Sequence, residues 1–270
     1  MIISTEQLEK LHQVELKALL KFDQVCRKYN LQYTLDGGTL LGAIRHKGFI
    51  PWDDDTDVCM LREDFEKLRS IPKEEWGNDF FYQSHETDSN YKYTYDKLRV
   101  NGTFFGEKAL DHTGIKNNGI FLDIFPLDAV PDDARQNKQI FDFELLRLLF
   151  MSKYINIDYR HGFEKKVAKT IRVLFKGVST EKMFNATEKI IKKYNNQGFT
   201  RNRSFASFNL KNNVYDSSFL EETYDAEFEG YKFKVSKHYD EILTNLYGDY
   251  MKLPPKEERI NKHEVTGLIV

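Results

Sequence analysis

Four aspartates fall within five consecutive positions early in the chain, at Asp53, Asp54, Asp55 and Asp57. Packing does not require such a group, and like charges held this close repel one another. A divalent cation that binds oxygen ligands would relieve the repulsion, which suits Mg²⁺ or Mn²⁺. Two residues apart on a strand, the side chains of Asp55 and Asp57 would share one face. We therefore expect these two carboxylates to bind a metal ion.

A glycine pair lies upstream of the aspartates, at Gly37 and Gly38, and Thr39 follows it. The turn and a short helix predicted over 39–45 would offer backbone N–H groups and a helix N-terminus, which bind phosphate. A metal site and a phosphate site in one short segment favour phosphoryl transfer from a nucleotide-type donor. Either feature alone is usually only a turn. The hypothesis therefore depends on both occurring together, in the order strand, turn, helix, loop, strand.

Further groups near this segment are candidates for binding the donor. Arg45 and His46 follow the short helix, and Lys97 and Arg99 share one face of a strand predicted over 91–100. All four could hold phosphate oxygens, and a surface charge is the simpler alternative for each. The expected donor-binding set is Gly37, Gly38, Thr39, Arg45, His46, Asp53, Asp54, Lys97 and Arg99.

One aspartate interrupts an apolar strand predicted over 120–125, which ends at the following proline. An unpaired charge inside such a strand is costly, so Asp123 needs either a basic partner or a metal ion. We expect the metal, with Asp123 as the third catalytic carboxylate beside Asp55 and Asp57. Asp123 could accept the proton of an attacking hydroxyl directly, or the metal could lower that hydroxyl's pKa. Asp128, beyond the proline, is expected to be structural.

The segment over 35–58 resembles the LicD family of phosphocholine transferases, whose relatives include fukutin and fukutin-related protein. Segments 123–128 and 247–255 resemble two further parts of the same pattern. The resemblance implies a nucleotidyltransferase-like fold, in which a Gly-Gly turn precedes an Asp-x-Asp strand and a third carboxylate follows on a later strand. The first two of these features are matched by Gly37, Gly38, Asp55 and Asp57.

The resemblance also implies a reaction. Phosphocholine passes from CDP-choline to a sugar hydroxyl of a lipid-linked cell-surface glycan precursor (teichoic acid, lipopolysaccharide or capsule), and CMP leaves. Because members of the wider family transfer other groups, a CDP-ribitol donor is an alternative. A choline group prefers an aromatic cage, for which Trp52, Tyr93 and Tyr95 are candidates by their position. Core packing is the commoner role of such aromatic residues.

Three other functions fit parts of the pattern. A small-molecule nucleotidyltransferase would leave the nucleoside monophosphate on the acceptor and release pyrophosphate instead of CMP. A glycosyltransferase with an Asp-x-Asp metal site would need a larger nucleotide-binding half, and the Gly-Gly turn argues against it. A catalytically inactive binding module would be expected to lose metal carboxylates, whereas Asp55, Asp57 and Asp123 are all present.

Composition limits the remaining classes. The 270 residues carry a formal net charge of −2, which does not suit a protein that coats nucleic acid. We expect neither a signal peptide nor a membrane-spanning segment, because the chain has no basic flank before an apolar run and no sufficiently long apolar stretch. These features favour a cytoplasmic protein. The segment 160–178, rich in Lys and Arg, is either a solvated basic face or a contact with the inner face of the membrane.

The pattern of elements indicates an α+β fold, with a nucleotidyltransferase-like mixed sheet and flanking helices. We expect a catalytic core over 1–130, a helical region over 131–200, and strands and a helix that complete the core over 201–270. Cys26 and Cys59 are expected as buried free thiols, and His263 as an exposed residue of a polar tail. Helices are predicted over 5–29, 39–45, 64–69, 134–154, 163–178, 180–195 and 237–247. Strands are predicted over 32–35, 57–61, 80–83, 91–100, 103–105 (returning on 91–100 as a hairpin), 120–125, 203–210 and 226–235 (with a turn at Gly230).

Overall fold

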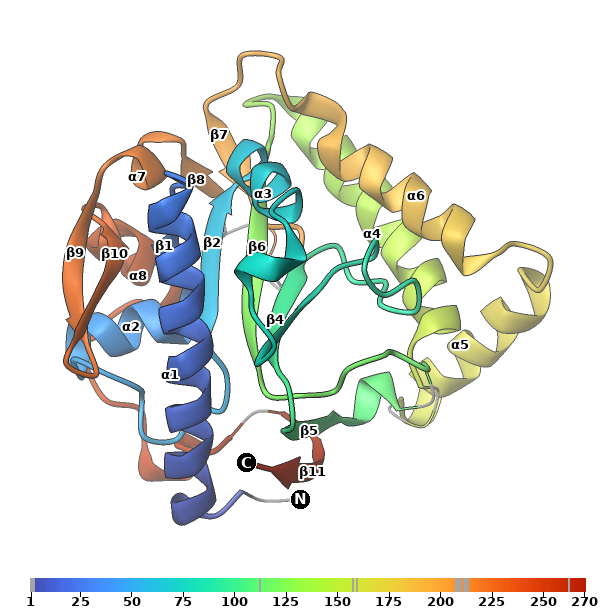
Figure 1. Ribbon diagram of the computed structural model, residues 1–270. Coiled ribbons are helices and arrows are strands. Elements are labelled where there is room, and N and C mark those ends of the chain that lie inside the picture. Colours follow the sequence, from blue (N-terminus) through green and yellow to red (C-terminus); the bar gives the residue numbers. More distant parts are fainter. Residues whose placement is uncertain are drawn as a thin grey trace.

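The computed structural model describes residues 3–111, 113–156, 158, 160–206, 210, 214–261 and 263–270. A mixed β-sheet with strand order β1-β2-β6-β4-β3 forms the centre, and helices flank it (Figure 1). The α+β prediction is confirmed. The sheet is built from β1 (Thr34–Leu35), β2 (Asp57–Leu61), β6 (Phe121–Ala129), β4 (Asp96–Val100) and β3 (Phe80–Gln83), with β7 (Arg201–Arg203) on β6 and β8 (Val214–Asp216) on β7.

The longest helix of the first half, α1 (Thr5–Lys28), begins at a capping box in which Ser4 and Gln7 satisfy each other's backbone N–H groups. Its buried residues recur every three or four positions, and this apolar face packs against the sheet. Cys26 lies on that face and Cys59 on β2, and both are buried free thiols, as expected. The main hydrophobic core lies between α1, the sheet and the C-terminal elements.

Two short helices follow strands of the sheet directly. The helix α2 (Gly37–Arg45) leads away from β1, and α3 (Arg62–Arg69) follows β2. The backbone between α2 and β2 carries the aspartate-rich loop. As a result, the start of α2 and the start of β2 lie at the same end of the sheet, where β1 and β2 pair in antiparallel fashion.

A helical half packs beside the sheet. It consists of α4 (Ala134–Tyr154), α5 (Gly162–Leu174) and α6 (Thr180–Ile191), with small apolar clusters of its own (Figure 1). Side chains of Asp133 and Ser179 accept hydrogen bonds from the first turns of α4 and α6, which explains where these helices begin. No helix within the described ranges is both long enough and apolar enough to span a bilayer.

The C-terminal residues return to the core. A hairpin of β9 (Thr223–Phe228) and β10 (Tyr231–Ser236) has its turn at Gly230, as predicted, and the short α7 (Ser218–Glu221) precedes it. Next comes α8 (Tyr239–Tyr247), which packs on α2. The chain ends with β11 (Val265–Ile269), which pairs with β5 (Phe104–Glu107).

Four strand predictions are wrong. The strand expected over 91–100 begins only at Asp96, and β5 pairs with β11 instead of returning on β4. The strand expected to end at Pro126 continues to Ala129. Along one edge of β6, the pairing with β4 ends at Ile124 and the pairing with β7 begins at Asp128. Pro126, which has no N–H to donate, lies in the gap between these two pairings. The strand expected over 203–210 ends at Arg203, and residues 207–209 lie outside the described part of the chain.

Candidate active site

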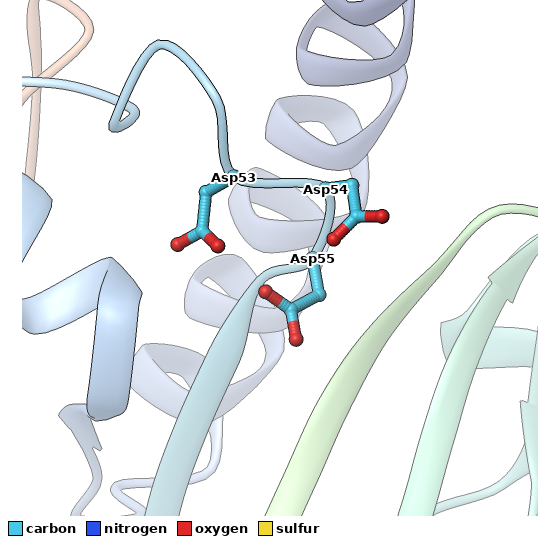
Figure 2. A group of neighbouring side chains, drawn as sticks. All are labelled: Asp53, Asp54 and Asp55. Carbon is cyan, nitrogen blue, oxygen red and sulfur yellow. The ribbon is translucent and has the colours of Figure 1, made fainter. Parts of the chain in front are cut away.

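The aspartate-rich loop brings three carboxylates close together at the entrance to β2. One carboxylate oxygen from each of Asp53, Asp54 and Asp55 lies within 4.8 Å of the others (Figure 2). Asp54 is buried, with 1% of its surface exposed, whereas its two neighbours are half-buried. Oxygen ligands at this spacing suit a divalent cation. The expected acidic cluster therefore exists at the entrance to β2.

Two further carboxylates extend the cluster along the sheet. Asp57 opens β2 and lies directly beside Asp123 of the parallel strand β6. Burial, Asp55 and Asp123 together raise the pKa of Asp57 well above its usual range. Burial likewise raises the pKa of Asp123 to about 6, although Lys97 opposes the rise. Both carboxylates therefore hold protons more tightly than an ordinary aspartate does.

The glycine pair packs against these carboxylates. A Cβ atom on Gly38 would lie 2.2 Å from Oδ2 of Asp53, and one on Gly37 would lie 3.0 Å from Oδ2 of Asp57. Gly37 also has a φ of +52°, which favours glycine. The two glycines form the first turn of α2 instead of a separate turn before it. Any larger residue here would displace an acidic side chain.

Thr39 also lies against the acidic cluster, but through a different contact. Its Oγ1 accepts a hydrogen bond of 2.8 Å from the backbone N–H of Asp57. The N–H of Asp36 donates to the carbonyl of Asp57 at 3.0 Å. These two bonds hold the start of β2 against the start of α2. The main contact of Thr39 in this structure is therefore with the start of β2.

The two basic residues of β4, Lys97 and Arg99, have different contacts with the acidic cluster. Lys97 is buried, and its Nζ lies 2.9 Å from Oδ1 of Asp123 and 3.4 Å from Glu107. Arg99 is fully buried, and its guanidinium is held by Gln83, the carbonyl of Gly119 and Glu107. The alternative of a surface charge is wrong for Arg99, because no face of the side chain reaches solvent. Of these two residues, only Lys97 contacts Asp123, the expected third carboxylate.

Arg45 and His46 lie at the opposite end of α2 from the glycines. Nine residues separate the two ends by about 12 Å, since a helix rises 1.5 Å per residue. Arg45 donates to the carbonyl of Tyr250 at 2.6 Å and to Nε2 of His46 at 3.0 Å. The ring of His46 meets that of Trp52 edge to face. These groups form a separate cluster next to the aspartate-rich loop.

The three candidates for a choline cage have different neighbours. Trp52 contacts His46, and the guanidinium carbon of Arg259 lies 5.3 Å from its ring centre. Tyr93 and Tyr95 stack on each other with ring centres 5.0 Å apart, and Tyr95 also packs on Phe125. The two tyrosines belong to an irregular segment before β4 and not to a strand.

His263 is a site residue that sequence reasoning missed. Its Nδ1 lies 3.0 Å from Oδ1 of Asp54, its backbone N–H donates to Oδ2 of Asp54, and its Nε2 lies 3.9 Å from Asp55. Asp54 and Asp55 raise the pKa of this imidazole to about 9 against the opposing effect of burial. The expectation of an exposed histidine is wrong because β11 carries the tail back onto β5. No local pattern around His263 indicates that return.

Glu15 is a second missed residue, and here a signal existed. It lies among the apolar positions of the buried face of α1 and is 1% exposed. Burial raises its pKa well above the usual range, and Asp55 and Asp53 raise it further. An acid on the buried stripe of an amphipathic helix is unusual enough to mark a special environment. Burial and the nearby carboxylates of the acidic loop therefore favour the neutral form of Glu15.

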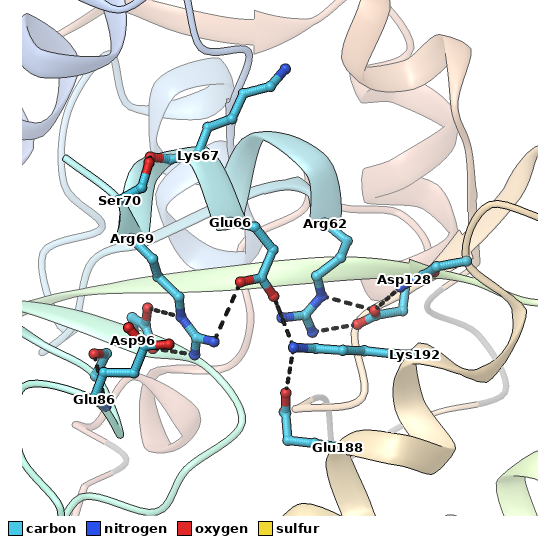
Figure 3. Close-up of polar contacts among 12 residues, drawn as sticks. Arg62, Glu66, Lys67, Arg69, Ser70, Glu86, Asp96, Asp128, Glu188 and Lys192 are labelled. Carbon is cyan, nitrogen blue, oxygen red and sulfur yellow. Dashed lines mark hydrogen bonds and ion pairs between the residues drawn. The ribbon is translucent and has the colours of Figure 1, made fainter.

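Asp128 is structural, as expected. Its two carboxylate oxygens accept hydrogen bonds of 2.9 and 2.7 Å from Arg62 (Figure 3), and Oδ1 also accepts one from Asn195. This ion pair borders a cavity of about 790 Å³ at the far end of β2. Lys192, another residue of the cavity wall, pairs with Glu66 and Glu188. The charged groups are thus paired with one another, and the acidic loop does not line this cavity.

Comparison with known proteins agrees with the geometry. Residues 30–156 match the family model described as LicD/FKTN/FKRP, nucleotidyltransferase domain. The chain is 30% identical over 259 residues to the lipopolysaccharide cholinephosphotransferase LicD of Haemophilus influenzae, and the match covers 92% of each chain. It is also 39% identical over 75 residues to an uncharacterized protein of Rickettsia prowazekii, a match that covers 26% of this chain and 28% of the other. The matched residues include the glycine pair and all five acidic positions of the cluster.

Proposed function

The chain belongs to the LicD family, and on that premise we propose that it transfers phosphocholine from CDP-choline to a sugar hydroxyl of a cell-surface glycan precursor. The name of the H. influenzae relative supports phosphocholine as the transferred group and lipopolysaccharide as the acceptor class. Teichoic acid or a capsule repeat would offer the same hydroxyl chemistry. The observation that carries the proposal is the meeting of Asp53, Asp55, Asp57 and Asp123 at the first turn of α2.

The donor set of the cluster fits Mg²⁺ or Mn²⁺. Its ligands are hard carboxylate oxygens, and burial and mutual repulsion raise the pKa values of Asp57 and Asp123, a strain that a bound cation would relieve. We propose that Asp55, Asp57 and Asp123 hold the metal, with Asp53 beside them against Gly38. When bound, the ion would neutralise the diphosphate of the donor and stabilise the charge that develops on the leaving CMP.

The first turn of α2 is suited to a phosphate group of the donor. The carboxylate of the cap residue Asp36 interacts with the N–H of Gly37 but makes no capping hydrogen bond further into the first turn, where backbone N–H groups suit a ligand. The glycines keep this turn free of side chains. A phosphate bound there would lie beside Asp53 and Asp57, against which the glycines pack.

Asp123 is suited to accept the proton of the acceptor hydroxyl. The hydroxyl oxygen would bond to the phosphorus of the choline phosphate, the bond from that phosphorus to the CMP oxygen would break, and the proton would pass to Asp123. A pKa of about 6 leaves this carboxylate ionised at neutral pH and basic enough for the role. Lys97, 2.9 Å away, fixes its orientation. Direct proton transfer and a metal-lowered hydroxyl pKa are both compatible with this arrangement.

The proposal is tested by product analysis. The purified chain is incubated with Mg²⁺, a glycan acceptor, and CDP-choline, CDP-ribitol or CTP in turn. Release of CMP from CDP-choline, together with acceptor that gains phosphocholine, supports the proposal. Release of CMP from CDP-ribitol alone would replace the transferred group and keep the mechanism. Release of pyrophosphate from CTP would overturn the proposal in favour of a nucleotidyltransferase.

A further inference from the structure

The helix α5 exposes large apolar side chains far from the acidic cluster. Phe163 is 79% exposed, Val173 is 74% exposed and Leu174 is 72% exposed. Single exposed apolar residues are common on soluble proteins, but a contiguous group usually marks a surface that contacts something. Eleven residues separate Phe163 from Leu174, which is close to three helical turns, so the two side chains lie on the same face.

Polar contacts fix the orientation of α5. Arg172 donates hydrogen bonds of 2.8 Å to the carbonyls of Ser152 and Ile155 at the end of α4. Lys153 of α4 donates in turn to the carbonyl of Phe175. Ala168 and Ile171 are buried on the side of α5 that faces its neighbours. The exposed apolar face is therefore held outward by the fold and does not depend on one rotamer.

A second exposed apolar stripe lies on α4, the helix to which α5 is attached. Phe141, Leu145 and Leu148 are 67%, 48% and 42% exposed, and their spacing of four and three residues places them in one stripe. The stripe runs toward Ser152, where Arg172 attaches α5 to α4. We call the exposed apolar residues of α4 and α5 together the docking face. It consists of Phe141, Leu145, Leu148, Phe163, Val173 and Leu174.

Positive charge surrounds the docking face. Residues 158–178 contain six Lys or Arg and two acidic residues, a net charge of +4, whereas the whole chain carries −2. Lys165 pairs with Asp158 at 2.7 Å. In the part of the chain that the structure describes, Lys166, Lys169 and Lys176 have no acidic group within 4 Å. An apolar face bordered by unpaired lysines is typical of a helix that lies in a membrane interface.

We propose that the docking face binds an anionic membrane surface, with its apolar side chains among the acyl chains and its lysines at the lipid phosphates. A second copy of the chain fits less well. A two-fold dimer through this face would bring the same lysines of both copies together, and like charges repel. An anionic bilayer neutralises them instead. The inference does not depend on which group the enzyme transfers, because it concerns a surface separate from the carboxylates.

The test is flotation of the full chain with lipid vesicles. One set contains only phosphatidylcholine, and the other contains phosphatidylcholine with about a third phosphatidylglycerol. The wild type is expected to float with the anionic set at low salt and to be released at high salt. K166E/K169E should weaken binding about twentyfold or more, since each lysine near an anionic surface contributes about a fivefold gain. F163Q/L174Q should weaken binding at all salt concentrations.

Matched controls lie on β10 and at the residue that follows it, and β10 is on the other side of the molecule from α5 (Figure 1). K232E/K237E makes the same change of charge, and Y231Q removes an apolar group that is 49% exposed. Both controls should bind as the wild type does. Equal flotation with neutral and anionic vesicles, no flotation with either, or equal losses in the controls would overturn the proposal. So would a dimer in sedimentation that F163Q/L174Q dissociates. CMP release from CDP-choline with a soluble acceptor should be unchanged in every variant, which separates this test from that of the proposed function.

Discussion

Asp57 of β2 and Asp123 of β6 lie directly beside each other across a parallel strand pair. Because side chains at paired positions point to the same face of a sheet, two carboxylates share one small region. Lys97 neutralises part of the charge of Asp123, whereas Asp55 and Asp123 add to the repulsion on Asp57. The fold thus holds these groups in an arrangement that is costly without a cation.

Asp57→Asn should abolish turnover while the fold survives. The amide cannot replace a carboxylate ligand, so kcat should fall about a thousandfold or more, on the scale of losing one group that stabilises the transition state. The thermal midpoint without metal should not fall, because the amide replaces a carboxylate that Asp55 and Asp123 repel. CMP release and thermal denaturation measure the two effects. Asp79→Asn, an exposed aspartate near β3, is the control. A wild-type rate in the Asp57 variant would remove this residue from the site.

Gly38→Ala should impair the site without unfolding the protein. The added methyl would lie 2.2 Å from Oδ2 of Asp53, so that the carboxylate has to move. We expect Mg²⁺ affinity, measured by calorimetric titration, to fall about tenfold or more. Gly177→Ala is the matched control, because no atom lies within 4 Å of its added Cβ. Equal affinities of the two variants would show that the close approach of Gly38 to Asp53 has no part in metal binding.

Metal binding should depend on pH through the raised pKa values of the cluster. A cation must displace the protons of Asp57 and Asp123, whose pKa values are raised, the latter to about 6. The apparent affinity for Mg²⁺ should therefore fall as pH drops through 6, by up to about tenfold per unit for each displaced proton. Without metal, the stability of the folded protein should change with pH in the opposite direction to the metal affinity. The folded state binds these protons more tightly than the unfolded state, so stability should decline as pH rises from about 4 through 6.

Titrations at several pH values between 5 and 8 check the affinity, and thermal denaturation in a chelator checks the stability. Asp123→Asn should flatten both profiles in the region around pH 6. An Mg²⁺ affinity that is constant across this range would contradict the raised pKa of Asp123.

His263→Ala should weaken the site through Asp54. Removing the imidazole leaves Asp54 with only the backbone N–H of residue 263 from this segment, so the acidic loop loses a fixed partner. We expect kcat/KM to fall about 10- to 100-fold, with partial recovery in His263→Gln. The wild type should also lose stability as pH rises through about 9, because the folded protein keeps the imidazole protonated above its ordinary pKa. Neither variant should show that loss.

Kinetics and thermal denaturation between pH 6 and 10 measure these effects. His161→Ala, an exposed histidine before α5, is the control and should change neither. If His263→Ala kept the wild-type kcat/KM, the contact with Asp54 would be only a feature of packing.

Local patterns in the sequence predicted the centre of the site. The strand that begins at Asp57 and the helix from residue 134 to 154 have the predicted bounds, since both follow strong local periodicity. The four aspartates predicted an acidic cluster because they lie within a few positions of one another in the sequence, so their mutual repulsion does not depend on the rest of the fold. The loop and β2 together supply them from consecutive residues, so no distant contact was needed.

Long-range pairing decided what the sequence could not predict. Arg99 looked like a surface charge, but pairing of β4 between β3 and β6 buries it. The strand β6 continues through Pro126, which pairs with Met60 of β2, because β4 and β7 leave that position unpaired on the other edge. His263 reaches Asp54 because residues 265–269 pair with residues 104–107. Sequence periodicity contains no information on contacts between segments so far apart.

Asp128→Asn should separate a structural carboxylate from the catalytic ones. Asp128 is fully buried and accepts hydrogen bonds from both Arg62 and Asn195. Removing its charge leaves the guanidinium of Arg62 buried without a full partner, which should reduce the free energy of unfolding by about 3 to 5 kcal/mol. Below the unfolding transition, Mg²⁺ affinity and kcat per folded molecule should stay near wild type, because β6 places this residue five positions beyond Asp123. Asp123→Asn should give the converse result, with turnover lost and a smaller loss of stability, because Glu107 still pairs with Lys97. Denaturant titration and CMP release distinguish the two, and loss of turnover in a fully folded Asp128 variant would place Asp128 in the catalytic site.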